Sequence, residues 1–158
     1  MQQMFQEAVN HYLQSHGYNR LQLKAVLFDM DGVLFNSMPY HADAWHKVME
    51  RPGLHPSREE AYLHEGRTGA ATINIVYQRQ YGQDATPEMI ENIYAEKSIE
   101  FNSHPDAERI PGAWEVLQKI KADGLTPMVV TGSGQRSLLD RLSHNFPGLF
   151  RSELMVTA

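Results

Sequence analysis

The order of the predicted elements indicates an α/β protein, in which a parallel sheet carries a helical domain inserted after its first strand. The run KAVLF (residues 24–28) is apolar without alternation, which is typical of a strand buried on both faces. Helical patterns fill residues 39–101, and helix, strand, helix and strand follow from residue 111. Two polar motifs, DMDG and TGSG, follow the first two strands. They lie at the carboxyl ends of the strands, where such sheets bind ligands.

Composition limits the function classes. The chain has 158 residues, of which 42% are hydrophobic and 21% charged, so it is long enough for one core. Its net charge of -5 gives no general electrostatic reason to bind nucleic acid or an anionic membrane. The absence of cysteine excludes disulfides, thiolate metal sites and cysteine nucleophiles. The first 20 residues lack the features of a signal peptide and no segment approaches a membrane span, so we expect a cytoplasmic protein.

The N-terminal segment predicts an accessory helix within residues 1–20. Its apolar residues recur at helical spacing, and Gly17 provides a stop signal. These apolar residues are Met4, Phe5, Ala8, Val9, Tyr12 and Leu13.

The predicted helices between the first two strands have clear start signals. Pro39 lies in a first turn, and Ser57 with Glu60 forms the S-x-x-E pattern of a capping box. Thr86 and Pro87 form a cap followed by proline at the first helical position. We therefore expect several separate helices rather than one long helix.

The C-terminal part predicts alternating elements. A helix over residues 111–124 is followed by the strand TPMVV (residues 126–130), a helix over about residues 135–144 and the strand ELMVTA (residues 153–158). We expect a core made of residues 21–37 and 107–158, with a helical insert over residues 38–106.

The stretch DMDG carries the first candidate chemistry. Because side chains alternate along an extended segment, Asp29 and Asp31 can point toward one cleft while Met30 points away. Paired carboxylates suit a divalent metal or acid–base chemistry. A calcium loop requires glycine at its sixth position, whereas Gly32 is fourth here, so that alternative is set aside. A plain Asp-Gly turn after a strand remains the other interpretation of this pattern alone.

Two motifs in sequence order carry a family resemblance. FDMDGVLFNS resembles the first signature of the haloacid dehalogenase superfamily, and VVTGSG resembles the second. The position of the helical insert and the stretch HADAW resemble the β-phosphoglucomutase-like subfamily, which has an α-helical cap. The resemblance implies a three-layer Rossmann-like core, apparently truncated after its third strand, with an inserted cap domain. Trp45, within HADAW, is expected to pack inside the cap rather than form a stacking platform.

The resemblance implies a role for each residue of these motifs. Asp29 would be the nucleophile that forms an aspartyl phosphate, and Asp31 would be the general acid and base. Both would hold Mg²⁺, which screens the charge of the phosphoryl group. Thr131 and the backbone N–H of Gly132 would bind the transferring phosphoryl oxygens, with Gly132 and Gly134 permitting close approach. An ordinary strand-to-helix turn is the alternative for these glycines.

The cap supplies candidate substrate contacts. His41 lies where the subfamily carries a histidine near the leaving group, and a solvated histidine is the alternative. Sugar-phosphate mutases of the subfamily carry lysine and arginine where HEGRTGAAT has Glu65 and Gly69, and Arg67 is out of register. The stretch is more similar to that of the subfamily's inorganic pyrophosphatases, in which a cap acid helps to hold the metal. An exposed polar loop is the alternative.

These features predict a Mg²⁺-dependent phosphohydrolase or phosphotransferase that acts on a small phosphorylated compound, pyrophosphate or a compact phosphate ester. A β-phosphoglucomutase and a catalytically incomplete binding module are the alternatives. The lysine and acidic residues of the family's third and fourth motifs have no counterpart before Ala158, so we expect a longer protein and a first strand on a sheet edge.

Overall fold

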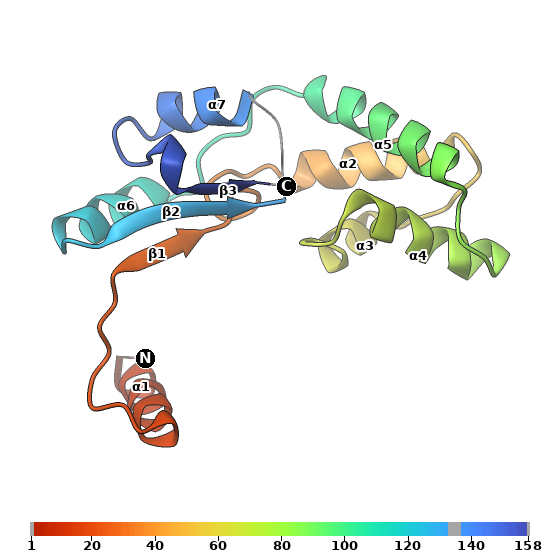
Figure 1. Cartoon of the computed structure of the whole chain (residues 1–158). Coiled ribbons are helices and arrows are strands. Elements are labelled where there is room, and N and C mark those ends of the chain that lie inside the picture. The colour runs from red at the N-terminus through yellow and green to blue at the C-terminus, as the bar shows by residue number, and fades with distance from the viewer. Residues whose placement is uncertain (1, 133–136, 158) are drawn as a thin grey trace.

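The computed structural model describes residues 2–132 and 137–157 (Figure 1). Gly134, the start of the helix predicted at residue 135, and Ala158 lie outside the described residues. The described elements confirm the α/β fold, in which a parallel three-stranded sheet accompanies many helices.

The sheet consists of parallel strands in the order β1-β2-β3. The register pairs Phe28 with Val129 and Val129 with Met155, so these three side chains point to one face of the sheet. That face contains the main buried core of the molecule. The strands are β1 (Ala25–Phe28), β2 (Thr126–Thr131) and β3 (Met155–Thr157).

Two helices cover this face of the sheet. Helices α6 (Ala113–Ala122) and α7 (Ser137–Asn145) supply Leu117 and Leu142 to the cluster of buried residues that contains Val129. Both helices connect strands that progress in one direction across the sheet, and right-handed crossovers therefore place them on the same side.

No helix or strand in the described part of the chain covers the opposite face of the sheet. Its apolar residues Leu27, Val130 and Val156 are 62%, 37% and 55% exposed. The prediction that residues 24–28 are buried on both faces is therefore wrong here. Strand β1 has one neighbour and one covered face, as expected of an edge strand, so Leu27 points into solvent.

The helical insert begins at Met38, shortly after the DMDG turn. Ser57 and Glu60 form the predicted capping box, with both reciprocal bonds present. Thr86 caps the next predicted start by accepting a bond from the backbone N–H of Met89. The inserted helices are α2 (Met38–Glu50), α3 (Arg58–Leu63), α4 (Gly69–Tyr81) and α5 (Pro87–Asn102).

The insert has its own core. Its buried residues form a cluster separate from that of the sheet, and Trp45 packs against it as predicted. The cluster consists of Val48, Met49, Leu54, Ile73, Val76, Ala85 and Ile93.

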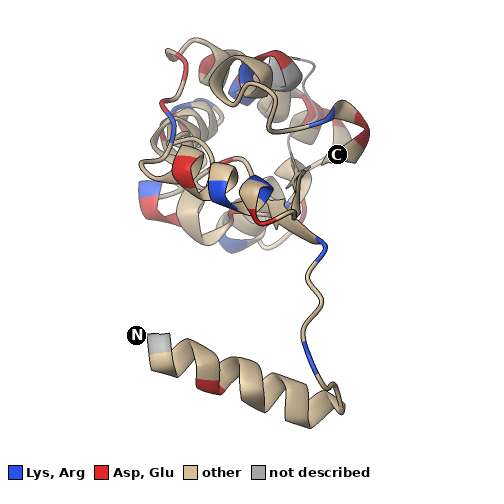
Figure 2. Cartoon of the chain, turned by 90° about the vertical axis from the view of Figure 1, so that its left-hand side faces the viewer, with Lys and Arg blue, Asp and Glu red and all other residues tan. Residues whose placement is uncertain are grey.

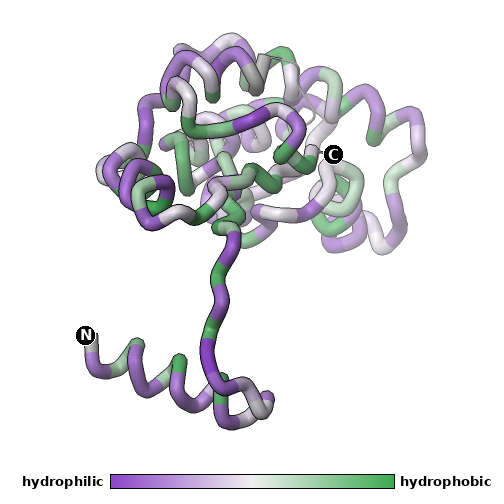
Figure 3. Tube along the Cα trace, turned by 60° about the vertical axis from the view of Figure 1, so that its left-hand side comes forward, coloured by the Kyte–Doolittle hydropathy of each residue, from purple (hydrophilic) through white to green (hydrophobic). Residues whose placement is uncertain are grey.

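The predicted N-terminal helix is present as α1 (Gln2–His16) and ends before Gly17, whose φ of 68° is left-handed. Figures 1 and 2 show α1 apart from the other elements, at the end of an extended segment. Hydrophobic positions recur along the helix (Figure 3). Met4 and Phe5 are each 60% exposed.

The last strand is shorter than predicted. Glu153 and Leu154 belong to the 3₁₀ helix η1 (Ser152–Leu154), so pairing with β2 begins only at Met155. None of the helices in the described part of the chain has the length and apolarity needed to cross a membrane.

Candidate active site

The two aspartates lie on the turn that follows β1. The carbonyl of Met30 accepts a bond from the Phe35 N–H at 3.0 Å, and the Gly32 N–H donates to the Phe35 carbonyl at 2.9 Å. Gly32 has a φ of 75°, which glycine adopts without strain. Met30 is buried in the core, and Asp29 and Asp31 on either side of it both line one cavity.

This cavity has a volume of about 620 Å³ and lies between the sheet and the helical insert. It brings together seven candidate residues predicted from the sequence, although they come from segments far apart in the chain. Those residues are Asp29, Asp31, His41, Glu65, Arg67, Thr131 and Gly132.

Thr131 and Gly132 reach the cavity from the end of the central strand. Thr131 is the last residue of β2 and is 7% exposed. A Cβ atom at Gly132 would have no atom within 4 Å, so the space beside this backbone is open toward the cavity. The arrangement leaves room for a ligand at the carboxyl end of the sheet.

Asp31 is held by two side chains of α2 and its cap. The Ser37 hydroxyl donates to Asp31 Oδ1 at 2.6 Å, and His41 Nε2 lies 3.4 Å from the same oxygen. Ser37 occupies the N-cap position of α2 but makes no side-chain capping bond. The Ser37 hydroxyl therefore bonds to a buried carboxylate and does not cap the helix.

His41 is oriented from its other side by Lys97 of α5. Lys97 Nζ lies 2.8 Å from His41 Nδ1, and the His41 ring stacks on Phe101 at 4.1 Å. Nδ1 of His41 therefore faces Lys97, and Nε2 faces Asp31. The side chains of Lys97, His41 and Asp31 therefore form a chain from the insert to the sheet.

Lys97 is buried, and burial lowers its pKa to about 8. The negative charges of Asp31 and Glu65 act in the opposite direction and favour the ammonium.

Glu65 adds a carboxylate from the helical insert to the two aspartates in the cavity. Burial raises its pKa, His41 lowers it, and repulsion from Asp31 and Asp29 raises it further. Asp29, Asp31 and Glu65, together with Glu91 in the same lining, therefore create a negative field that a cation would offset. Carboxylate oxygens are the ligands that Mg²⁺ prefers, so Asp29 and Asp31 fit the ion that the family implies.

Arg67 and His64 also line the cavity. Among the described residues no ion pair joins Arg67 to Glu65. Both ring nitrogens of His64 are buried without a hydrogen-bond partner in the described part of the chain.

A second acidic cluster lies outside the cavity. Ligand atoms of Asp43, Glu100 and His104 lie within 4.8 Å of one another, a spacing that could hold a metal ion. Lys47 Nζ, however, lies 2.7 Å from Asp43 and 3.2 Å from Glu100, and Arg58 is 3.3 Å from Asp43. Because cationic side chains already neutralise these acids, the cluster is an ion-pair network between helices of the insert.

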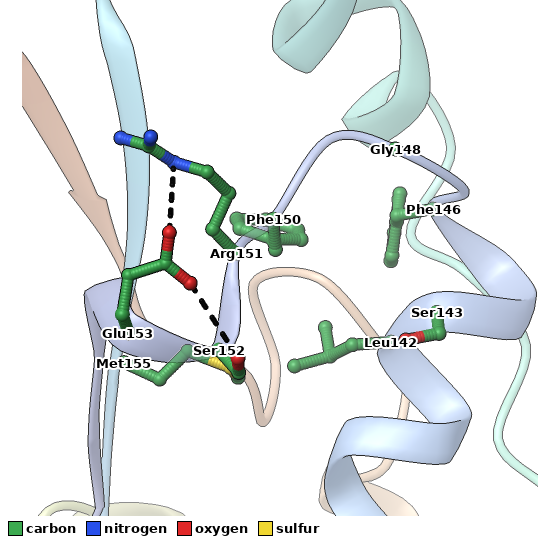
Figure 4. A pocket seen from close by; sticks show the side chains of 9 residues that line it. All are labelled: Leu142, Ser143, Phe146, Gly148, Phe150, Arg151, Ser152, Glu153 and Met155. Atoms are coloured by element: carbon green, nitrogen blue, oxygen red, sulfur yellow. Dashed lines mark hydrogen bonds and ion pairs between the residues drawn. The ribbon is translucent and has the colours of Figure 1, made fainter.

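Figure 4 shows a smaller cavity of about 360 Å³ between α7 and η1. Its charged lining is Arg151 and Glu153, which pair at 3.7 Å. It contains neither of the two aspartates nor Thr131, so we do not place the chemistry there.

Sequence reasoning missed Ser37 and Lys97 as members of the site. Ser37 ends the motif FDMDGVLFNS, and its position after the aspartates was a usable signal. Lys97 is 56 residues from His41, and only the packing of α5 against α2 reveals the contact.

Comparisons with known proteins agree with this geometry. A family model described as haloacid dehalogenase-like hydrolase matches residues 26–149. Hexitol phosphatase A of Escherichia coli (strain K12) is 28% identical over 140 residues, covering 87% of this chain and 61% of that protein. The phosphorylated carbohydrates phosphatase of Thermotoga maritima is 28% identical over 123 residues, covering 76% of this chain and 55% of that protein.

A solved structure is similar over nearly the whole chain. It is described as "Putative beta-phosphoglucomutase from Bacteroides vulgatus", and it matches with 67% identity and a TM-score of 0.92. The match covers 98% of this chain and 62% of that one. The chain thus spans about three fifths of the length of the relatives named first. These comparisons lend no support to the pyrophosphatase interpretation of Glu65, which stays a prediction.

Proposed function

Because the chain belongs to the haloacid dehalogenase-like hydrolase family, we propose that the protein removes or transfers the phosphoryl group of a small phosphorylated carbohydrate through Asp29. One observation carries the proposal. Asp29 and Asp31 flank a buried Met30 and open into the same cavity as Thr131. Nucleophile, proton donor and phosphate-binding group would then lie at one end of the sheet.

The chemistry needs two steps. A carboxylate oxygen of Asp29 bonds to phosphorus while the bond to the leaving oxygen breaks, and Asp31 gives its proton to that oxygen. Asp31 then takes a proton from water, whose oxygen attacks phosphorus, and the bond to Asp29 breaks to release phosphate. In a mutase a substrate hydroxyl would take the place of this water.

Asp29 and Asp31 would hold Mg²⁺, which offsets negative charge around the phosphoryl group when bound. Thr131 and the Gly132 N–H would bind phosphoryl oxygens. The Ser37 hydroxyl and the chain from Lys97 through His41 would fix the orientation of Asp31.

A sugar-phosphate mutase is the second candidate, because the Bacteroides vulgatus relative carries that description at 67% identity. The names of the two curated relatives favour hydrolysis of phosphorylated carbohydrates. Release of inorganic phosphate from a hexitol phosphate indicates the hydrolase, whereas interconversion of glucose phosphates without net release indicates the mutase.

The testing experiment compares the full-length protein with its Asp29→Asn variant. We expect turnover to fall by at least about a thousandfold, because the amide keeps the shape and removes the nucleophile. Thermal unfolding serves as the control for folding. Asp31→Asn should still allow slow phosphorylation of Asp29 while blocking efficient turnover. Activity of Asp29→Asn within tenfold of the wild type would overturn the assignment.

A further inference from the structure

One wall of the cavity is aromatic. Tyr94 and Trp45 both line it, and their ring centroids are 6.3 Å apart. Trp45 is fixed from behind by the core of the insert, and Lys97 Nζ lies 5.3 Å from its ring centroid. Tyr94 lines the cavity and is 45% exposed, so it is not enclosed by the core of the insert.

Tyr94 also explains why residue 69 is glycine. A Cβ atom built on Gly69 would lie 2.2 Å from Cδ2 and 2.4 Å from Cε2 of the Tyr94 ring. These separations are far shorter than any carbon–carbon contact. The ring therefore rests on the α4 backbone, in the space where a side chain at residue 69 would begin.

The charged side chains of the cavity favour one phosphate group over two. Lys97 is engaged by His41, so Arg67 is the cationic side chain that remains for an anionic ligand among the described lining residues. Glu65 and Glu91 also line the cavity and would repel a second phosphate. Carboxylates do accept hydrogen bonds from hydroxyl groups.

We propose that Tyr94, seated on Gly69 beside Trp45, is a specificity wall against which the uncharged, hydroxyl-bearing part of a monophosphorylated polyol or sugar packs. The Tyr94 ring would cover the C–H groups of the carbon chain, while Glu65 and Glu91 accept bonds from its hydroxyls. The site thereby selects such phosphomonoesters against bisphosphates and pyrophosphate. This inference rests on the proposed function and deepens it.

The test measures kcat/KM of the full-length protein with four probes: a hexitol 6-phosphate, the corresponding 1,6-bisphosphate, pyrophosphate, and acetyl phosphate, whose remainder is too short to reach the wall. Tyr94→Ala should lower kcat/KM for the hexitol 6-phosphate about tenfold, the value of lost apolar contact in a pocket. Acetyl phosphate should change less than about threefold. Tyr94→Phe should retain the wild-type preference, because it keeps the ring.

Gly69→Arg supplies the reverse test. The new side chain must displace the Tyr94 ring and adds a cation, so the ratio of kcat/KM for bisphosphate over monophosphate should rise at least about tenfold. Tyr62→Ala is the matched control, since Tyr62 is a half-exposed tyrosine outside the cavity lining.

The outcomes separate this inference from the proposed function. The role of Tyr94 alone would be overturned if Tyr94→Ala lost kcat/KM equally for hexitol 6-phosphate and acetyl phosphate. A higher kcat/KM of the wild type for pyrophosphate or bisphosphate than for the monophosphate would also overturn it. A wild-type protein that releases phosphate from none of the probes and interconverts no sugar phosphates would overturn both.

Discussion

Ser37 uses its hydroxyl to hold Asp31 and leaves α2 without a side-chain cap. It is fully buried and stands at the N-cap position of α2, where a serine hydroxyl usually accepts a backbone N–H bond. Its hydroxyl donates instead to Asp31 Oδ1 at 2.6 Å. A hydrogen bond to a charged carboxylate is stronger than one between neutral groups. The bond to a carboxylate therefore explains why the hydroxyl does not cap the helix.

Ser37→Ala should lower kcat about tenfold or more with little change in KM, because Asp31 loses the bond that orients it. Steady-state kinetics of the full-length protein measure this effect. Ser15→Ala, whose hydroxyl bonds to the Tyr12 carbonyl on the exposed α1, is the control. A rise in KM alone would show that Ser37 supports substrate binding rather than proton transfer.

Lys97 makes the stability of the fold depend on pH. Its pKa falls from 10.5 to about 8 on folding because the ammonium is buried. Between these values the unfolded chain binds more protons than the folded one, so stability rises as the pH increases. From pH 7 to pH 10 the free energy of unfolding should rise by about 2 kcal/mol relative to a Lys97→Met variant. Denaturant titrations at the two pH values measure it, and parallel curves for both proteins would contradict this origin.

The sequence predicted the members of the site that belong to the strand ends. Asp29 and Asp31 follow β1 and Thr131 ends β2 of the same parallel sheet, so strand periodicity with sheet topology is enough to bring them together. Lys97 could not be found in this way. Its contact with His41 depends on the packing of α5 against α2, which no local pattern encodes.

At the scale of elements, the start of α3 was predicted correctly from a local sequence pattern. Ser57 and Glu60 form the capping box that the spacing predicts, and Glu60 also pairs with Arg79 of α4. The cap therefore fixes both the start of α3 and its neighbour. The loop that follows α3 carries Glu65 into the cavity.

Ser57→Ala should lower the free energy of unfolding by about 1 kcal/mol, the usual loss on removal of an N-cap side chain. Chemical denaturation measures it, and kcat for the hexitol phosphate should be unchanged because Ser57 lies outside the cavity. A stability loss below the measurement error would mean that the Glu60 and Arg79 pair alone fixes α3.

Strands were predicted less accurately than helices. Caps and prolines lie within the helix they begin, so residue patterns locate helix starts directly. The burial of a strand depends instead on what lies beside it. The apolar run of β1 correctly predicts a strand, yet Leu27 is exposed because no described element covers that face of the sheet or pairs with the outer edge of β1. The length of β3 also depends on its neighbour, because pairing with β2 begins only at Met155.

At the scale of the whole molecule, the uncovered face of the sheet exposes apolar side chains to water. Parallel sheets are ordinarily covered on both faces, and here Leu27, Val130 and Val156 form an apolar surface next to the free edge of β1. Helix α1 adds a second set of exposed apolar side chains, including Met4 and Phe5. Either surface could drive association of the 158-residue chain.

We expect the 158-residue chain to self-associate through the sheet, because an apolar face and an unpaired strand edge adjoin there. Light scattering across a concentration series should show mass above the monomer, and Leu27→Lys with Val156→Lys should reduce it. Both residues are exposed, so the substitutions place charge in water without disturbing the core. Leu63→Lys, at a residue 75% exposed on α3, is the matched control. Removal of residues 1–20 assigns the surface: association that persists without α1 supports the sheet, whereas association that disappears shows that the helix carries it.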